Sequence, residues 1–225
     1  MKIKRIEYQD QEYEWKIESL EFLPNLTLLV GGSGAGKTQI LQSIFKLKEI
    51  ANGESFNGVK WDIYFLTENN VSYRWKGEFE TKKTDELFLD QIIREEHEFD
   101  IVEEFIYRDD QKIIERNSQR IFFKNEKMPK LPPSQSIVEL FEQEEDIAPA
   151  KENLDKIIFS KPYKAVEEAN FVFFSRSQPD ENYSLDDIQN SDLSVPAKLL
   201  FVHRYSPEIF QKIKNIFMIL LKKIR

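Results

Sequence analysis

The sequence predicts an α/β fold in which a buried strand, a glycine-rich loop and a helix form the core. An antiparallel β-subdomain and a C-terminal helical lobe are predicted to flank this core. Residues 26–30 are a continuous apolar run, which is typical of a parallel strand buried on both faces. Four of the seven glycines fall within residues 31–36, directly after that run. Beyond residue 132, the apolar spacing changes from a period of two to helical spacing.

The elements around the glycine-rich loop are predicted from their periodicity. Residues 2–6 and 13–17 alternate polar and apolar side chains, which indicates two half-buried strands. A helix is predicted after the loop, with Gly53 as its stop signal. Its apolar residues recur at helical spacing and are Ile40, Leu41, Ile44, Phe45 and Leu47.

The middle of the chain predicts an antiparallel meander. Residues 61–66 and 71–75 form a hairpin pattern joined through residues 68–70. After a predicted acidic helix at residues 85–98, short strands are predicted at residues 101–107, 112–115 and 120–123, with turns at Asp109-Asp110 and Asn117-Ser118. We therefore expect two domains, a core with its β-subdomain over residues 1–130 and a mainly helical lobe over residues 131–225.

The glycine-rich loop carries the most specific motif in the chain. Its residues are Gly31, Gly32, Ser33, Gly34, Ala35, Gly36, Lys37 and Thr38, which match the pattern G-x-x-x-x-G-K-[ST] in full. Glycines let successive backbone N–H groups surround a polyphosphate, and the following helix adds the positive end of its dipole. Lys37 is expected to reach the terminal phosphates, and the Thr38 hydroxyl is expected to ligate Mg²⁺. The motif predicts binding of a nucleoside triphosphate.

With the segments around it, this loop resembles the ABC-type ATPase heads of RecF-like, OLD-like and SMC-like proteins, which in bacteria are called AAA family ATPases. The shared features are the strands at residues 2–6 and 15–17, the run at residues 22–31 and the antiparallel strands after the loop helix. The resemblance implies a P-loop NTPase core of ABC-ATPase type that uses ATP and Mg²⁺. It also implies a second ATPase head as dimer partner and a role in DNA processing or defence, with DNA or a nuclease as a further partner.

The resemblance also implies a glutamine that senses Mg²⁺ and the γ-phosphate. Residues 130–136 lie where such heads carry this glutamine, so the catalytic role is carried over to Gln135. Gln143 and Gln178 remain alternatives for that role.

Three other motifs of such heads are missing. No apolar strand ends in Asp-Glu, since residues 171–174 are followed by Ser-Arg and residues 63–66 by Thr-Glu. The only Ser-Gly pair lies inside the loop, and neither His97 nor His203 follows a predicted core strand. The chain therefore resembles the N-terminal half of a head, and we expect it to bind ATP but to hydrolyse it poorly without a C-terminal half.

Charge and composition limit the class of protein. There are 32 basic and 40 acidic residues, a net charge of −8, so bulk charge does not favour nucleic acid. The absence of cysteine fits a reducing compartment, and no apolar run is long enough to span a bilayer. We expect a cytoplasmic protein with no membrane contact.

Two other functions remain open. The loop also resembles that of uridine-kinase-like enzymes, which predicts a small-molecule kinase with a parallel sheet and a basic lid. Alternatively, the missing motifs indicate a truncated, non-catalytic nucleotide-binding fragment. The alternating hairpin strands after the loop favour the ATPase head over the kinase.

Overall fold

The computed structural model describes residues 1–82, 98–159, 183–191, 193 and 195–223. The chain forms two compact units, residues 1–157 and residues 158–225. The predicted division at residue 130 falls inside the first unit. Almost all of the helix predicted at residues 85–98 lies outside the described residues, as does the apolar run at residues 171–174.

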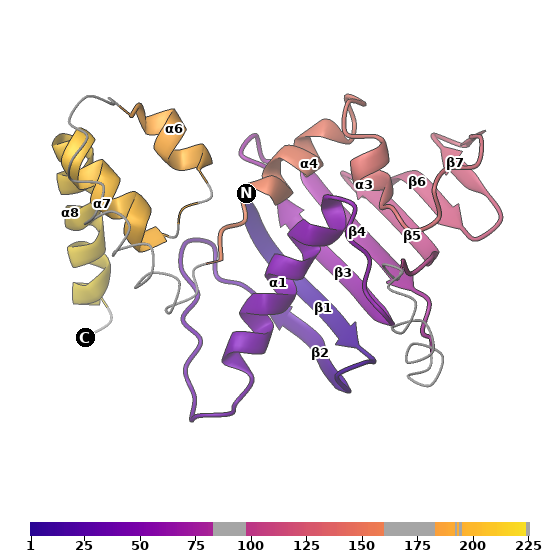
Figure 1. Ribbon diagram of the computed structural model, residues 1–225, viewed down its shortest axis with the longest axis horizontal. Coiled ribbons are helices and arrows are strands. Elements are labelled where there is room, and N and C mark those ends of the chain that lie inside the picture. Colours follow the sequence, from indigo (N-terminus) through magenta and orange to yellow (C-terminus); the bar gives the residue numbers. More distant parts are fainter. Residues whose placement is uncertain (83–97, 160–182, 192, 194, 224–225) are drawn as a thin grey trace, which may run out of the picture. The chain divides into compact units, whose positions relative to one another are not determined.

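The first unit is built on an open sheet of eight strands in the order β2-β1-β3-β4-β5-β6-β7-β8 (Figure 1). Each neighbouring pair is antiparallel. The strands are β1 (Lys2–Asp10), β2 (Trp15–Glu21), β3 (Val59–Leu66), β4 (Ser72–Phe79), β5 (Ile101–Arg108), β6 (Gln111–Asn117), β7 (Ile121–Phe123) and β8 (Glu126–Lys127). In β3 and β4, buried residues alternate with more exposed ones, because successive side chains of a strand point to opposite faces.

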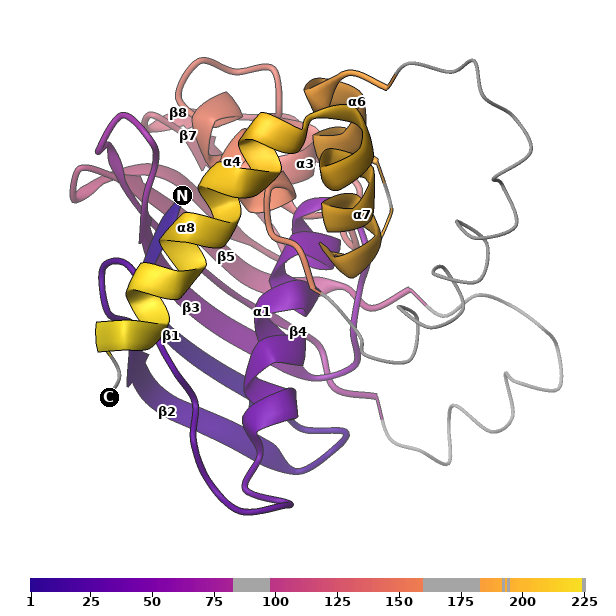
Figure 2. The same cartoon turned by 90° about the vertical axis from the view of Figure 1, so that its left-hand side faces the viewer.

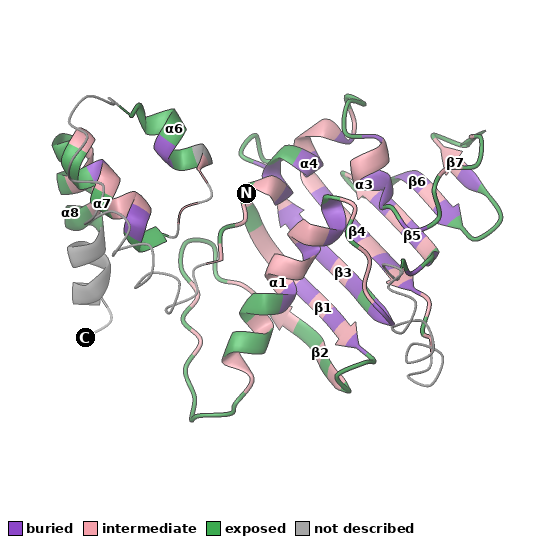
Figure 3. Ribbon diagram, in the orientation of Figure 1, coloured by how far each residue is buried: buried purple, intermediate pink, exposed green. Residues whose placement is uncertain are grey.

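In the described part of this unit, helices α1, α3 and α4 cover one face of the sheet (Figure 2). They are α1 (Lys37–Ala51), α3 (Ile137–Leu140) and α4 (Ala148–Asp155). The core consists of apolar side chains from the covered face, among them Ile63 and Trp75, packed in one cluster with Leu47 and Ile50 of α1. Figure 3 shows these buried residues on the strands and on the C-terminal part of α1. The sheet is therefore half-covered, as antiparallel sheets commonly are.

Two tight turns set the register of the hairpins. Asp109 and Asp110 have φ of 47° and 62°, and Lys124 and Asn125 have φ of 50° and 68°. Two successive residues with positive φ twist a turn in the sense that matches the flanking strands. The first turn was predicted from its two aspartates, whereas the second was not.

The second unit is helical where it is described. Its helices are α6 (Leu185–Asn190), α7 (Val195–Tyr205) and α8 (Pro207–Lys223). Ser184 caps α6, since its hydroxyl accepts from the Asp187 N–H and the Asp187 carboxylate accepts from the Ser184 N–H. Tyr183, Phe201 and Tyr205 form a cluster with ring centroids 5.3–5.9 Å apart.

The predicted fold class is wrong. Within the described residues the sheet is entirely antiparallel, so there is no P-loop NTPase core of ABC-ATPase type with a buried parallel strand. Residues 26–30 form no strand, and Leu28 and Val30 are 62% and 80% exposed. The reason is topological: after α1 the chain enters β3, which pairs with β1 in the antiparallel sense and leaves residues 26–30 without a neighbour.

A buried carboxylate joins the sheet to α3. Glu104 on β5 is fully buried, and its Oε1 accepts hydrogen bonds from Trp75 Nε1 and Ser136 Oγ at 2.8 and 2.6 Å. Its Oε2 accepts from the Ile137 N–H at 3.0 Å. The pKa of Glu104 is raised overall, because the effect of burial exceeds that of these three hydrogen bonds and the Arg116 guanidinium, which lower it. Because each of these groups donates a hydrogen bond, both carboxylate oxygens of Glu104 act as acceptors.

Arg116 on β6 extends this network to the segment before α3. Its guanidinium lies 3.9 Å from Glu104 and is 3% exposed. Its Nη1 and Nη2 donate to the carbonyl oxygens of Gln135 and Pro132 at 2.6 and 2.5 Å. The pair therefore fixes residues 132–136 against the sheet. Leaving either partner alone would strand a buried charge.

Truncation of Leu28 tests the exposed position of residues 26–30. We expect Leu28→Ala to change the free energy of unfolding by less than about 0.5 kcal/mol, because the side chain loses little contact. Leu47→Ala in α1 is the matched control and should cost about 2–5 kcal/mol, because Leu47 is fully buried. Urea denaturation measures both values. A loss at Leu28 as large as that at Leu47 would show that the segment is buried in solution.

Substitution of Glu104 tests the buried network. Glu104→Gln places an amide donor among groups that are all donors, and should lower the free energy of unfolding by about 3–5 kcal/mol. Glu103→Gln, at the adjacent and less buried residue, should change it by less than about 0.5 kcal/mol. Equal effects of the two substitutions in chemical denaturation would rule out this role of Glu104.

Candidate functional site

The loop of residues 31–38 connects the exposed segment to α1, which begins at Lys37. Gly34 and Gly36 have φ of 80° and 79°, in the left-handed region that glycine adopts without strain. The Ala35 N–H donates to the Gly32 carbonyl oxygen at 3.4 Å, which closes a turn within the loop. The glycines of the motif therefore supply a backbone bend that side chains would oppose.

Lys37 folds back over this loop. Its Nζ donates to the carbonyl oxygens of Gly31 and Gly32 at 2.8 and 2.7 Å. Among the described residues no carboxylate lies within ion-pair distance of Lys37. An ammonium group held by carbonyl oxygens alone keeps its full charge available to an anion.

The start of α1 leaves several donors free. No side chain caps this end of the helix, and no acidic residue lies in its first turn. Within the described part of the chain, the N–H groups of Gly34, Gly36, Lys37 and Thr38 donate no hydrogen bond, and neither does the exposed Thr38 hydroxyl. Unpaired N–H groups at a helix N-terminus carry partial positive charge and attract anions. The loop thus combines exposed backbone donors with one ammonium group.

An apolar segment leads into this loop. Leu23, Leu26, Leu28 and Val30 are 67%, 45%, 62% and 80% exposed. In the described residues, the main chain of residues 26–30 makes no backbone hydrogen bond. Figure 3 shows this stretch between β2 and α1 as mainly exposed. Exposed aliphatic side chains with unpaired backbone groups are typical of a surface that a partner covers.

Gln135 is not brought to the loop. It is exposed, immediately before Ser136, the N-cap of α3. That part of the unit packs at the C-terminal end of α1, where a Cβ at Gly53 would lie 3.8 Å from Glu139 of α3. Because α1 has 15 residues, its two ends are about 22 Å apart. The geometry therefore does not bring Gln135 together with Lys37.

The other residues singled out by sequence are scattered. Gln143 is exposed in the turn after α3, and His203 is exposed on α7 against the ring of Phe210. Gln178 and His97 lie outside the described residues. Where the chain is described, no three His, Cys, Asp or Glu side chains gather as metal ligands would.

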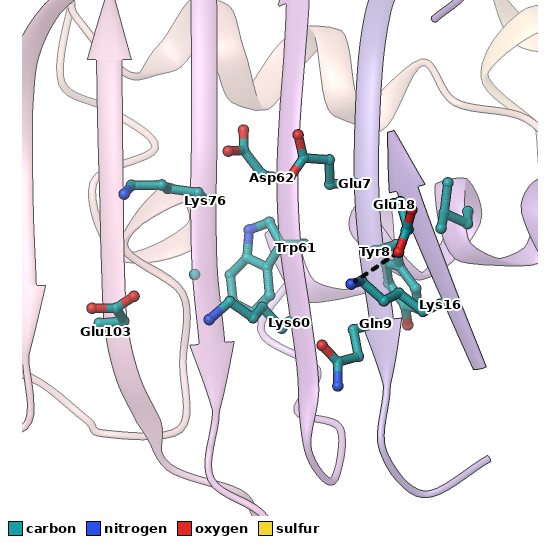
Figure 4. A pocket seen from close by; sticks show the side chains of 12 residues that line it. Glu7, Tyr8, Gln9, Lys16, Glu18, Lys60, Trp61, Asp62, Lys76 and Glu103 are labelled. Carbon is teal, nitrogen blue, oxygen red and sulfur yellow. Dashed lines mark ion pairs between the residues drawn. The ribbon is translucent and has the colours of Figure 1, made fainter. Parts of the chain in front are cut away.

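A hollow of about 350 Å³ lies over β1–β5 (Figure 4). Its charged lining is already engaged: Lys16 pairs with Glu18 at 3.6 Å, and Lys60 pairs with Glu78 at 2.7 Å. Lys76 lies over the ring of Phe105, 4.4 Å from its centroid. The remaining charges that line it are Glu7, Asp62 and Glu103. Because opposite charges are mixed and paired here, the hollow favours no particular class of ligand.

Comparison with known proteins leaves the loop as the main guide to function. Every helix in the described residues is too short or too polar to cross a bilayer. No protein-family model matches the chain, and no similar protein was found among curated proteins or solved structures.

Proposed function

We propose that the chain binds a nucleoside triphosphate, ATP as the sequence resemblance implies, through residues 31–38. The observation that carries the proposal is the position of Lys37, whose ammonium group lies against the loop carbonyls beside an uncapped helix N-terminus. This combination is the one that phosphate binding requires, since it provides one mobile cation and several fixed donors.

The loop offers two kinds of interaction to the phosphates. The free N–H groups of Gly34, Gly36 and Lys37 would donate to phosphate oxygens without moving, because the backbone already holds them in place. The Lys37 ammonium would exchange its two carbonyl acceptors for charged phosphate oxygens, which are stronger acceptors.

Magnesium fits the same site through Thr38. The Thr38 hydroxyl is exposed at the start of α1 and free of other hydrogen bonds in the described structure. Mg²⁺ commonly takes only one or two protein ligands and completes its shell with phosphate oxygens and water. The lack of a carboxylate cluster in the described residues is compatible with this arrangement. When bound, Mg²⁺ would neutralise part of the phosphate charge.

A protein partner belongs to this proposal. The sequence predicts a second ATPase head or a separate C-terminal half as the partner. The exposed side chains of Leu23, Leu26, Leu28 and Val30 directly before the loop support the presence of such a chain, because they leave an apolar surface uncovered. We propose that this partner covers the segment and closes over the bound nucleotide.

Replacement of Lys37 tests nucleotide binding. Lys37→Ala removes the one cation of the loop and should weaken Mg²⁺-ATP binding by about 1.5–3 kcal/mol, or roughly 10- to 150-fold. Isothermal titration calorimetry measures the affinity. Lys16→Ala, at an exposed lysine of β2, is the control for a change in net charge and should leave the affinity unaltered.

Thr38→Val tests the contribution of the Mg²⁺ ligand separately from that of the phosphate-binding groups. It should lower the affinity for ATP with Mg²⁺ to the value measured without Mg²⁺, because only the metal ligand is lost.

If the affinity of Lys37→Ala equals that of the unmodified protein, residues 31–38 do not bind phosphate.

The isolated chain should hydrolyse ATP only at background rate. Hydrolysis requires groups beyond the loop that orient the attacking water and stabilise charge. No strand in the described residues ends in Asp-Glu, and Gln135 lies at the other end of α1. A steady-state phosphate-release assay checks this expectation. Turnover near about 1 per second, lost in Lys37→Ala, would reveal a catalytic group within the chain.

A further inference from the structure

A cavity of about 400 Å³ lies at the β8 end of the sheet. It is bounded by the turn that joins β6 to β7 and by residues 127–133, which include the end of β8. The charged residues that line it, where the chain is described, are all cationic: Arg116, Arg120, Lys127 and Lys130. We call this cavity the basic pocket. It is unusual in a chain with a net charge of −8.

Three of these cations lack a counter-charge. Arg120, Lys127 and Lys130 are exposed and form no ion pair within the described residues. The fourth, Arg116, is buried and pairs with Glu104 at 3.9 Å. Among the described residues, no carboxylate lines the pocket. Uncompensated cations around a concave surface favour an anionic occupant.

The rest of the lining is largely apolar. Ile101, Ile121, Met128 and Leu131 contribute side chains of this kind, and Ile101 and Ile121 are buried. Pockets that bind small molecules have volumes of about 300–1,000 Å³ and combine an apolar lining with a few polar groups. The basic pocket has both properties.

Hydrogen bonds hold the turn at one side of the pocket. The Asn117 side-chain oxygen accepts from the N–H groups of Gln119 and Arg120 at 3.0 and 2.9 Å. The Asn117 N–H donates to the Arg120 carbonyl oxygen at 2.9 Å. These three hydrogen bonds therefore hold the backbone of the turn in place.

The opposite wall is also held in place. The Met128 N–H donates to the Ile121 carbonyl oxygen and the Ile101 N–H to that of Pro133, both at 2.9 Å. Arg116 adds its bond to the Pro132 carbonyl oxygen at 2.5 Å. A preformed pocket binds more tightly, because little conformational entropy is lost on binding.

We propose that the basic pocket binds a small organic anion, one phosphate or carboxylate group attached to an apolar body. The cations would bind the anionic group, and the buried isoleucines with Met128 and Leu131 would contact the apolar body. No aromatic ring of the described chain lines the pocket, so these residues provide no stacking platform of the kind on which single-stranded nucleic acids bind. The net charge of the chain also opposes a long polyanion.

Calorimetric titration of the full chain with hexyl phosphate and with hexanoate tests the proposal. At least one should bind at a single site with a dissociation constant of about 1 mM or tighter, and the comparison identifies the preferred anionic group. Inorganic phosphate and 1-hexanol, which carry only the charge or only the apolar body, should bind about tenfold more weakly or worse. The affinity should be the same in Lys37→Ala, which separates this pocket from the loop of residues 31–38.

Variants locate the binding site. The double variant Arg120→Gln with Lys130→Gln should weaken binding about tenfold or more, because both exposed cations lose their charge. The matched control is Lys16→Gln with Lys60→Gln, which changes net charge equally at the hollow over β1–β5 and should have no effect. Circular dichroism verifies that both variants are folded.

Three results would overturn the proposal. The first is that neither hexyl phosphate nor hexanoate binds. The second is equal weakening by the two double variants, since diffuse charge would then explain the binding. The third is an affinity for inorganic phosphate as high as that for hexyl phosphate, because the apolar lining would then contribute nothing.

Discussion

The antiparallel pairing of β3 with β1 is the constraint on which the rest of the first unit depends. Because the chain returns from α1 directly to the strand beside β1, α1 must cross the face that those strands share. The helix is anchored unevenly: Ser43, Leu47 and Ile50 are buried, whereas Thr38 and Leu41 near its start are exposed. The sheet therefore holds the C-terminal end of α1 and leaves the loop of residues 31–38 at a free, solvated end.

Local sequence was enough to predict the elements whose structure is local. The hairpins at residues 61–75 and 101–115 follow from alternation and from turn residues, and both are observed. The turn predicted at Asn117-Ser118 is also observed, between β6 and β7. These features depend on contacts between residues that are close in sequence, so periodicity and side-chain chemistry determine them.

The incorrect predictions concern residues whose structure depends on contacts with segments that are distant in sequence. The apolar run at residues 26–30 has the composition of a buried strand, but burial requires a neighbouring strand that the described chain does not supply. Glu103 and Glu104 show the same limit, because they are chemically identical neighbours and only strand register determines which one is buried. A signal for the basic pocket was present, since residues 116–130 hold five basic residues and one acidic residue. The sequence alone does not show that these residues line a pocket, because the folded turn between β6 and β7 brings them together.

The two ends of α1 are stabilised by different contacts, and a bound nucleotide would stabilise the N-terminal end. At the C-terminal end, a hydrogen bond between Asn52 and Lys151 joins α1 to α4, and Glu104 holds α3, so side-chain hydrogen bonds fix this end. At the N-terminal end, the N–H groups of the first turn have no acceptor among the described residues, and the preceding segment has no backbone pairing there. A polyphosphate would satisfy these donors, so its binding energy would stabilise the part of the unit that folding leaves weakest. Nucleotide binding would thereby stabilise the start of α1, directly after the apolar segment that a partner would cover.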